Sequence, residues 1–208
     1  MCCQHRSEKQ VIGDFKMKYF SIVCILSVCV FLAMGTHGET WGPSKPSEIG
    51  FDKAALVNQY YDLLSRSPNA DVSRNIFKEL WQTWMIAPDA DAAEGLNQAM
   101  RARGGYEFDK AIKILNDTIE QYPDFEQLYA ERSYVYFLKN DFSRSLTDCE
   151  KVIEIDEQHL GCLSGMARIL IRHQLRFKAG KSVLDKTVAI HPYIYEKILY
   201  NEIPAALL

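Results

Sequence analysis

A block of 34 residues recurs along the second half of the chain. The best-formed copy spans residues 126–159, and another copy lies on either side of it. Counting back 34 residues from Ser145 reaches Ala111, and the segment DFSRSLTDCEKVIEID then aligns with EFDKAIKILNDTIEQYP. Going forward, the pattern returns as RFKAGKSVLDKTVAIHP after one inserted residue near Arg176. Self-similarity at this period indicates stacked helix-turn-helix units, each of which buries its apolar face against its neighbours.

The residues at fixed places in each copy resemble those of the tetratricopeptide repeat. In that family a large residue stands at position 4, small residues at positions 8, 20 and 27, an aromatic or aliphatic residue at position 24, and a proline at position 32. The middle copy has, in chain order, Tyr129, Ser133, Ser145, Cys149 and Val152, with Glu157 in place of the proline. The first copy departs from the family at Gly95, which we expect to weaken its first helix. The first and third copies end at Pro123 and Pro192.

The resemblance covers about residues 92–192, over half of the chain. It implies an all-α fold, a short right-handed α-solenoid of about three helix-turn-helix repeats. Small residues in such a fold let the two helices of a repeat approach closely, and the large residues fill the space between neighbouring repeats. The resemblance is specific for the fold and unspecific for the function.

Two flanking segments complete the predicted fold. Apolar residues at near-helical spacing predict a helical hairpin over residues 51–90. We expect this hairpin to pack on the first repeat like a degenerate copy, with Trp81 and Trp84 as core residues. Residues 193–200 predict a capping helix over the last repeat, because an uncapped solenoid exposes its stacking face. The repeat domain with this cap therefore covers residues 91–208.

The first 38 residues have the pattern of a secretory signal peptide. Lys16 and Lys18 form a positive region, residues 19–32 form an apolar run, and small residues follow at the cleavage spacing. The apolar run is short for a membrane span, which needs about 20 residues. The alternative is an uncleaved signal anchor that tethers the chain to a membrane through residues 19–34.

The start of the leader has two interpretations. Either Met17 is the true start, or residues 1–16 extend the positive region. Residues 39–50, rich in proline, serine and glycine, then predict a linker. The export signal and the phrase HLGCLSGMARIL look like those of exported tetratricopeptide proteins of alphaproteobacteria. The resemblance implies a periplasmic or secreted protein, or, with an uncleaved anchor, an inner-membrane protein facing the periplasm.

Two cysteines, Cys149 and Cys162, lie downstream of the leader. Two thiols do not make a disulfide-stapled scaffold, and we interpret them as small buried hydrophobic residues. In an oxidising compartment a disulfide between adjacent helices is the alternative.

Charge is unevenly placed along the chain. Residues 91–159 contain 8 basic and 15 acidic residues, a net of −7, whereas residues 160–208 contain 7 and 3, a net of +4. The overall acidity and the predicted export argue against nucleic acid as a partner. The acidic middle and basic end suggest a polar partner surface or head-to-tail self-association, although solvated helix faces often carry such charge.

No motif for catalysis is found, since the chain lacks a Walker loop, a dinucleotide fingerprint, HExxH and GxSxG. His159, His173 and His191 lie in three different inter-helix segments without the spacing of metal ligands, and we expect them to be solvated or to cap helices. We therefore expect a protein that is not an enzyme and that binds no cofactor and no metal.

The resemblance also implies a concave groove lined by the first helix of each repeat. The family's ligand-facing positions give a candidate partner-binding set that combines apolar area with arginines for pairing with carboxylates. The set is Arg103, Gln127, Tyr134, Phe137, Arg168 and Arg172. The carboxylate-clamp form of this groove uses lysine and asparagine where this chain has Leu96 and Met100. Capture of a chain terminus by that clamp is therefore disfavoured.

These observations predict a non-catalytic adaptor or scaffold of the bacterial cell envelope that binds a protein or peptide in the concave groove. The alternative is a self-associating structural module, a homo-oligomer that an uncleaved signal anchor could tether to a membrane. With so few repeats, the groove could also be shallow or filled by the chain's own N-terminal hairpin or C-terminal tail.

Overall fold

The computed structural model describes residues 52–207, and each regular element in this range is a helix. The predicted signal peptide (residues 1–38), the tether (19–34) and the linker (39–50) lie outside the described residues. Within the described part the predicted all-α fold is confirmed.

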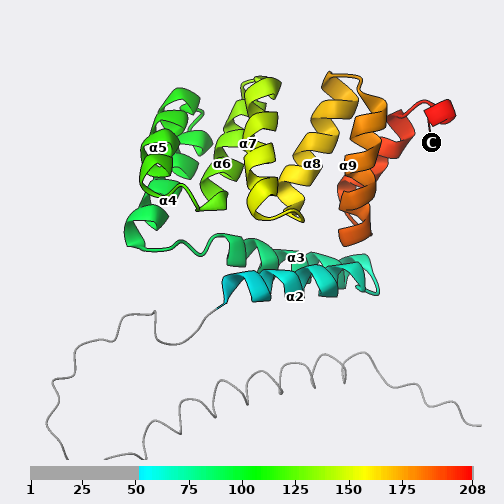
Figure 1. Ribbon diagram of the computed structural model, residues 1–208, viewed down its shortest axis with the longest axis horizontal. Coiled ribbons are helices and arrows are strands. Elements are labelled where there is room, and N and C mark those ends of the chain that lie inside the picture. Colours follow the sequence, from blue (N-terminus) through cyan, green and yellow to red (C-terminus); the bar gives the residue numbers. More distant parts are fainter. Residues whose placement is uncertain (1–51, 208) are drawn as a thin grey trace, which may run out of the picture. The chain divides into compact units, whose positions relative to one another are not determined.

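Three helix pairs follow one another and stand side by side (Figure 1). The first repeat is α4 (Ala90–Gly104) with α5 (Phe108–Gln121), and the second is α6 (Glu126–Leu138) with α7 (Phe142–Ile155). The third is α8 (Leu160–Arg168), extended by the π-helical turn η2 (Ile169–His173), with α9 (Phe177–Ile190). The helix-turn-helix repeats that the 34-residue period predicted are therefore present in the structure.

The turn between the two helices has the same backbone conformation in all three repeats. Tyr106, Asn140 and Leu175 occupy the left-handed region, with φ of 61°, 59° and 54°. They are separated by 34 and then 35 residues, so the extra residue of the third copy lies before Leu175. It is taken up by η2, where the π turn accommodates one more residue than an α turn. The insertion predicted near Arg176 therefore lies a few residues before it, in η2.

Gly95 occupies a position that usually holds a large residue in this fold. A glycine is accommodated here because Thr118 fills the space across from it. A Cβ atom on Gly95 would lie 2.5 Å from Oγ1 of Thr118, on the paired helix α5. A threonine at a usually small position thus compensates for the glycine. Helix α4 nevertheless runs through Gly95 for 15 residues, and Asp89 caps it by accepting a hydrogen bond from the Ala92 N–H at 2.9 Å.

The last repeat is covered by the predicted capping helix, which is a 3-10 helix, and by a second short 3-10 helix after it. These are η3 (Tyr195–Glu202) and η4 (Ala205–Leu207). Leu199 and Ile203 are buried in one cluster with Ala167 and Leu184 of the third repeat. The stacking face of the solenoid is therefore covered at this end.

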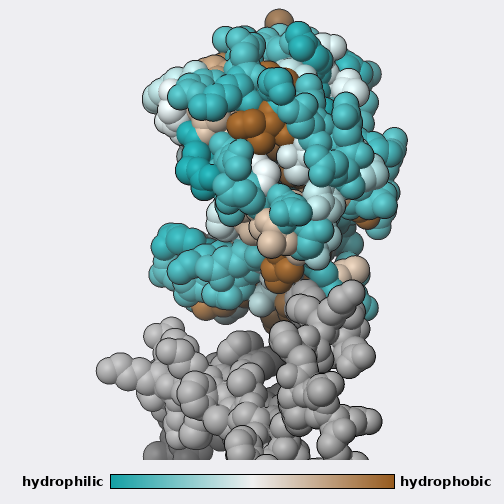
Figure 2. All heavy atoms as spheres, turned by 90° about the vertical axis from the view of Figure 1, so that its left-hand side faces the viewer, coloured by the Kyte–Doolittle hydropathy of each residue, from teal (hydrophilic) through white to brown (hydrophobic). Residues whose placement is uncertain are grey.

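The N-terminal hairpin, α2 (Lys53–Ser65) and α3 (Ala70–Trp84), does not stack on the first repeat. It runs across the ends of the repeat helices (Figure 1), and its apolar stripe packs on Leu160, Ile190 and Ile194. The expected degenerate repeat on the first copy was therefore wrong. The first-repeat end of the molecule, which faces the viewer in Figure 2, is mainly hydrophilic with small hydrophobic patches, so it offers little apolar surface for another repeat.

Polar pairs hold the hairpin in this place. The Tyr61 hydroxyl donates to the Asp156 carboxylate at 2.5 Å, and Tyr193 donates to the Pro68 carbonyl at 3.0 Å. Both bonds join segments that are far apart in the sequence, so the hairpin links the turns that follow the second and third repeats.

Candidate functional site

A cleft of about 700 Å³ lies over the first helices of the second and third repeats, α6 and α8. Its lining includes small residues on both helices, Ala130 of α6 together with Gly161, Ser164 and Gly165 of α8. A Cβ atom on Gly165 would meet no other atom within 4 Å, so the space next to it is open. The backbone of a bound segment can therefore approach these helices closely.

Helix α3 and the segment after α9 add further lining residues, many of them aromatic. Trp81 of α3 is 42% exposed, Tyr134 of α6 is 45% exposed and Tyr195 is 72% exposed. Tyr193 also lines the cleft, and its hydrogen bond to Pro68 ties the two walls together. Half-exposed rings around a hollow provide apolar contact area that the chain itself does not bury.

Four of the six residues predicted from the sequence line this cleft, namely Gln127, Tyr134, Phe137 and Arg168. Arg103 and Arg172 are not among its lining residues. Arg103 nevertheless contacts a residue that lines the cleft. Its guanidinium lies 5.0 Å from the centre of the Tyr134 ring and supports that side chain.

All three predicted arginines form ion pairs within the chain. Arg103 pairs with Glu131 of the next repeat, and Arg168 pairs with Glu196 of η3. Arg172 forms a two-pronged pair with Glu202, with its Nε at 2.9 and 3.0 Å from the two carboxylate oxygens, and these bonds raise the pKa of the guanidinium. A partner's carboxylate would therefore have to displace an internal one, so the arginines stabilise the repeat stack and its cap.

His159 is buried under the cleft and does cap a helix, as one of the sequence expectations had it. Its Nδ1 accepts from the Cys162 N–H at 3.2 Å at the start of α8, and its ring stacks on Trp84 with centroids 4.1 Å apart. Burial lowers the pKa of His159 to about 3, so the ring is neutral and carries its proton on Nε2.

Of the other two histidines, His173 is exposed, as expected, whereas His191 is not. His191 is buried and lies 3.1 Å from the Ser73 hydroxyl of α3, and burial lowers its pKa. His173 stacks on Phe142 with ring centroids 4.1 Å apart. The prediction that Trp81 and Trp84 are both core residues holds for Trp84, which is 2% exposed, and is wrong for Trp81.

Three polar atoms among the cleft residues are buried and make no hydrogen bond within the described part of the chain. They are Nε1 of Trp84, Oε1 of Gln127 and Nε2 of His159. Two of these atoms are donors and one is an acceptor, and a buried group without a partner carries a free-energy cost of about 1–3 kcal/mol. This local cost lies at the cleft, as is common at binding sites.

The part of the cleft that sequence reasoning missed comes from α3. Ala70, Arg74, Phe77 and Trp81 line it at a helical spacing of four, three and four residues. This stripe was visible in the sequence. The surface that the stripe faces was not predicted, because the hairpin was expected to pack on the first repeat.

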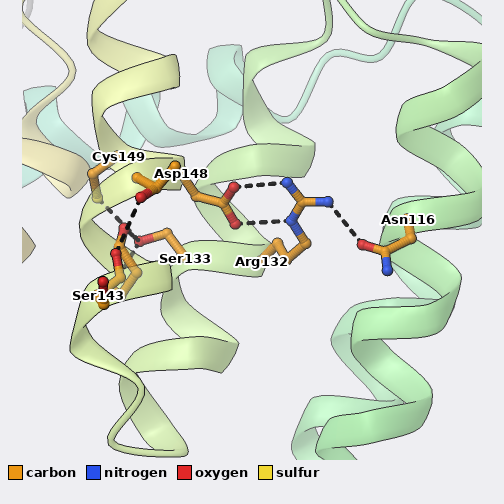
Figure 3. A network of polar contacts seen from close by, with 8 residues as sticks. Asn116, Arg132, Ser133, Ser143, Asp148 and Cys149 are labelled. Carbon is orange, nitrogen blue, oxygen red and sulfur yellow. Dashed lines mark hydrogen bonds and ion pairs between the residues drawn. The ribbon is translucent and has the colours of Figure 1, made fainter.

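Outside the cleft, the repeats are joined by a partly buried polar network (Figure 3). Arg132 of α6 donates to both carboxylate oxygens of Asp148 on α7, at 2.7 and 2.8 Å, and to Oδ1 of Asn116 on α5 at 2.7 Å. One guanidinium thus connects three consecutive helices. This network has a structural role in fixing the second repeat on the first.

Cys149 and Cys162 are free thiols, both buried at the cleft, as the favoured interpretation predicted. The Ser133 hydroxyl lies 3.0 Å from the Cys149 sulfur. A hydrogen bond with Cys149 and burial raise the pKa of the Cys162 thiol, so it stays protonated and weakly nucleophilic.

Within residues 52–207 there is no group of three or more His, Cys, Asp or Glu side chains that could hold a metal ion. No helix of that range is long and apolar enough to cross a membrane.

Comparison with known proteins gives a sequence relative and similar solved structures. No protein-family model matches the chain. The chain is 28% identical over 132 residues to a TPR repeat-containing protein of Rhizobium etli, an alphaproteobacterium; the match covers 62% of this chain and 65% of the relative. The fold is similar to that of the yeast Sti1 TPR2AB domain in its pHSP90 complex, with a TM-score of 0.51 and 19% identity, covering 70% of this chain and 61% of that one.

The two matches agree with the repeat geometry described above. The sequence relative carries the repeat in its name, and the solved structure shares the arrangement of paired helices. The resemblance stated from the 34-residue period is therefore confirmed: in sequence and in fold the chain is similar to tetratricopeptide repeat proteins.

Proposed function

We propose that this protein is a non-catalytic binding module that holds a short segment of a protein partner in the cleft over α6 and α8. The observation that carries the proposal is the combination of a lining of small residues on the two helices with half-exposed aromatic rings from α3, α6 and the segment after α9. A hollow with these properties offers contact area and close backbone approach without a reactive group. The yeast domain of similar fold was solved in a complex, which supports a protein or peptide as the partner.

The state of the titratable groups supports a non-catalytic role. Glu131 and Glu196 at the cleft are held in ion pairs, and His159 is neutral and buried. The thiol of Cys162 is buried, with a raised pKa. A general base or nucleophile needs an accessible group whose pKa lies near the working pH, and these groups do not provide one.

We further propose that the partner belongs to the bacterial cell envelope, where this chain would act as an adaptor or scaffold. The support is the predicted signal peptide over residues 1–38 and the alphaproteobacterial relative. The periplasm is the proposed compartment, with an uncleaved anchor through residues 19–34 as the alternative.

Site-specific photo-crosslinking of the full chain in its native cells tests the binding surface. A benzoyl-phenylalanine at Tyr134 replaces one aromatic side chain with another inside the cleft, and the same residue at Glu150, exposed on α7, is the matched control. We expect a discrete adduct from position 134 and none from position 150. Equal labelling from both positions, or no adduct from either, would remove the cleft as the binding site.

A further inference from the structure

The rings around the cleft are its most distinctive chemical feature. Trp81, Tyr134, Tyr193 and Tyr195 all belong to the exposed large apolar residues of the described chain, and all four line the same hollow. Trp81 and Tyr134 also carry an N–H and an O–H that make no hydrogen bond within residues 52–207. Each can therefore offer a flat apolar face and a donor to the same ligand.

Charge at the cleft is balanced internally. Its charged lining residues are Arg74, Glu131, Arg168 and Glu196. Glu131 is paired with Arg103, Glu196 with Arg168, and Arg74 with Asp71 at 3.2 Å. A charged ligand beside Glu131 or Arg168 would compete with their internal pairs, whereas an uncharged ligand leaves them intact. The Arg74–Asp71 pair is exposed to solvent and adds little to this preference. The cleft therefore favours a segment without charge at its centre.

The length of the α3 wall limits the size of the ligand. Its lining stripe runs from Ala70 to Trp81, and eleven helical steps span about 16 Å. A polyproline II segment rises about 3.1 Å per residue, so about five residues cover this wall. A bound α-helix would need a channel about 10 Å wide along its whole length and would present its own side chains to the lining of α6 and α8.

We propose, as a refinement that rests on the binding function above, that the cleft recognises an uncharged, proline-rich segment of a protein in the polyproline II conformation. Such a segment is already extended before binding, so it loses little conformational entropy, and its carbonyl groups are free to accept hydrogen bonds. Trp81 of α3 and Tyr134 of α6 stack on the proline rings and donate to the carbonyls. Helix α3, which lies outside the repeats, thus determines specificity.

Selection from a random dodecapeptide display library on the full chain tests this assignment, with Trp81→Ala as the counter-selected variant. We expect the peptides retained by the wild type and lost on the variant to be enriched in prolines at a spacing of three residues. Their affinities, measured by fluorescence anisotropy, should fall by about tenfold for Trp81→Ala and for Tyr134→Ala. Tyr106→Ala is the matched control, since Tyr106 is an exposed aromatic residue in the α4–α5 turn, away from the cleft.

The outcomes separate this inference from the broader function. Enriched peptides without proline, still lost on Trp81→Ala, would overturn the polyproline assignment and leave the peptide-binding function standing. Proline-rich peptides that bind Trp81→Ala as well as the wild type would also overturn it, because α3 would not contact them. If no peptide is enriched and no adduct forms at position 134, both proposals fail.

Discussion

Gly180 and Gly165 lie in the same repeat and have opposite surroundings. A Cβ atom on Gly180 would lie 2.5 Å from Cγ1 of Ile171 and 3.2 Å from Cβ of Leu170, both in the π turn η2. A Cβ atom on Gly165 would meet nothing within 4 Å. The inserted residue in η2 pushes the first helix of the third repeat against α9, and glycine at position 180 provides the room.

We predict that Gly180→Ala lowers the free energy of unfolding by about 1–3 kcal/mol, because overpacking outweighs the gain of about 1 kcal/mol that alanine brings to a helix. Gly165→Ala, the matched control, should be neutral or stabilise the chain by up to about 1 kcal/mol. Urea denaturation of the two variants measures both values. Similar effects of the two substitutions would contradict the close contact at η2.

His159 makes stability depend on pH in a defined window. Its pKa is about 3 in the folded chain and near 6.5 in the unfolded chain. Between these values the unfolded chain binds a proton that the folded chain does not. The free energy of unfolding therefore falls as the pH is lowered from 6.5 to 3, by up to about 1.4 kcal/mol per pH unit for one proton.

His159→Asn should make this dependence shallower, because asparagine can cap α8 and does not titrate. His191, whose pKa is also lowered by burial, keeps part of the slope. Denaturation curves at several pH values between 4 and 7 compare the slopes of the two proteins. An unchanged slope in the variant would mean that His159 is not buried in its neutral form.

At the level of elements, the cap η3 is held to the third repeat by apolar contacts and by ion pairs. Leu199 is buried against Leu184, while Arg168 pairs with Glu196 and Arg172 pairs with Glu202. Arginines that the sequence suggested for a partner thus attach the last element of the chain.

Reversing one charge of the Arg168–Glu196 pair should weaken the attachment of the cap. Reversing both charges should restore the pair and the stability. Arg168→Glu places two carboxylates together and should lower the free energy of unfolding by about 1–2 kcal/mol. The double variant Arg168→Glu with Glu196→Arg should recover most of that loss. Thermal unfolding of the wild type, both single variants and the double variant gives the coupling energy, and strictly additive effects would contradict the pairing.

For the whole molecule, the hairpin α2–α3 changes how the solenoid holds together. In a simple repeat array each unit touches only its neighbours. Here Trp84 stacks on His159 and Tyr61 bonds to Asp156, so the hairpin connects directly to the turn that precedes the third repeat. The hairpin also contacts the start of the second repeat, through the Lys53 ion pair to Glu126 at the start of α6.

We predict that Trp84→Ala, which costs about 3–5 kcal/mol by loss of a buried aromatic side chain, loosens the molecule unevenly. Amide hydrogen exchange should increase in α2, α3 and the start of α8, and change little in α4 and α5. Trp81→Ala on the same helix is the control and should leave exchange nearly unchanged, because that ring is half-exposed. An equal increase in every helix would show that the described chain unfolds as one unit.

The charge asymmetry along the chain also belongs to this scale. Residues of the acidic middle and basic end are partly neutralised inside the fold, as in the pairs Arg132–Asp148 and Arg168–Glu196. Self-association stays a prediction. If the chain self-associates through these charges, light scattering should detect a dimer that dissociates as the salt concentration rises. A strict monomer at low salt would exclude it.

Features that repeat at short range can be predicted from the amino-acid sequence. The 34-residue period, the helix pairs and the apolar faces are written in spacings of a few residues, because an α-helix brings residues three and four apart onto one face. The positions of Gln127, Tyr134, Phe137 and Arg168 on the inner helices followed from the same register.

Which faces pack against each other depends on contacts between segments that are distant in the sequence. The hairpin carries an apolar stripe that could have packed on either end of the solenoid, and its contacts with residues 156–194 join segments about a hundred residues apart. The partners of Arg103, Arg168 and Arg172 lie in the next structural unit, 28 or 30 residues away. Local spacing identifies a face as apolar or charged. The contact that satisfies it depends on the competition among distant surfaces, which is resolved when the chain packs.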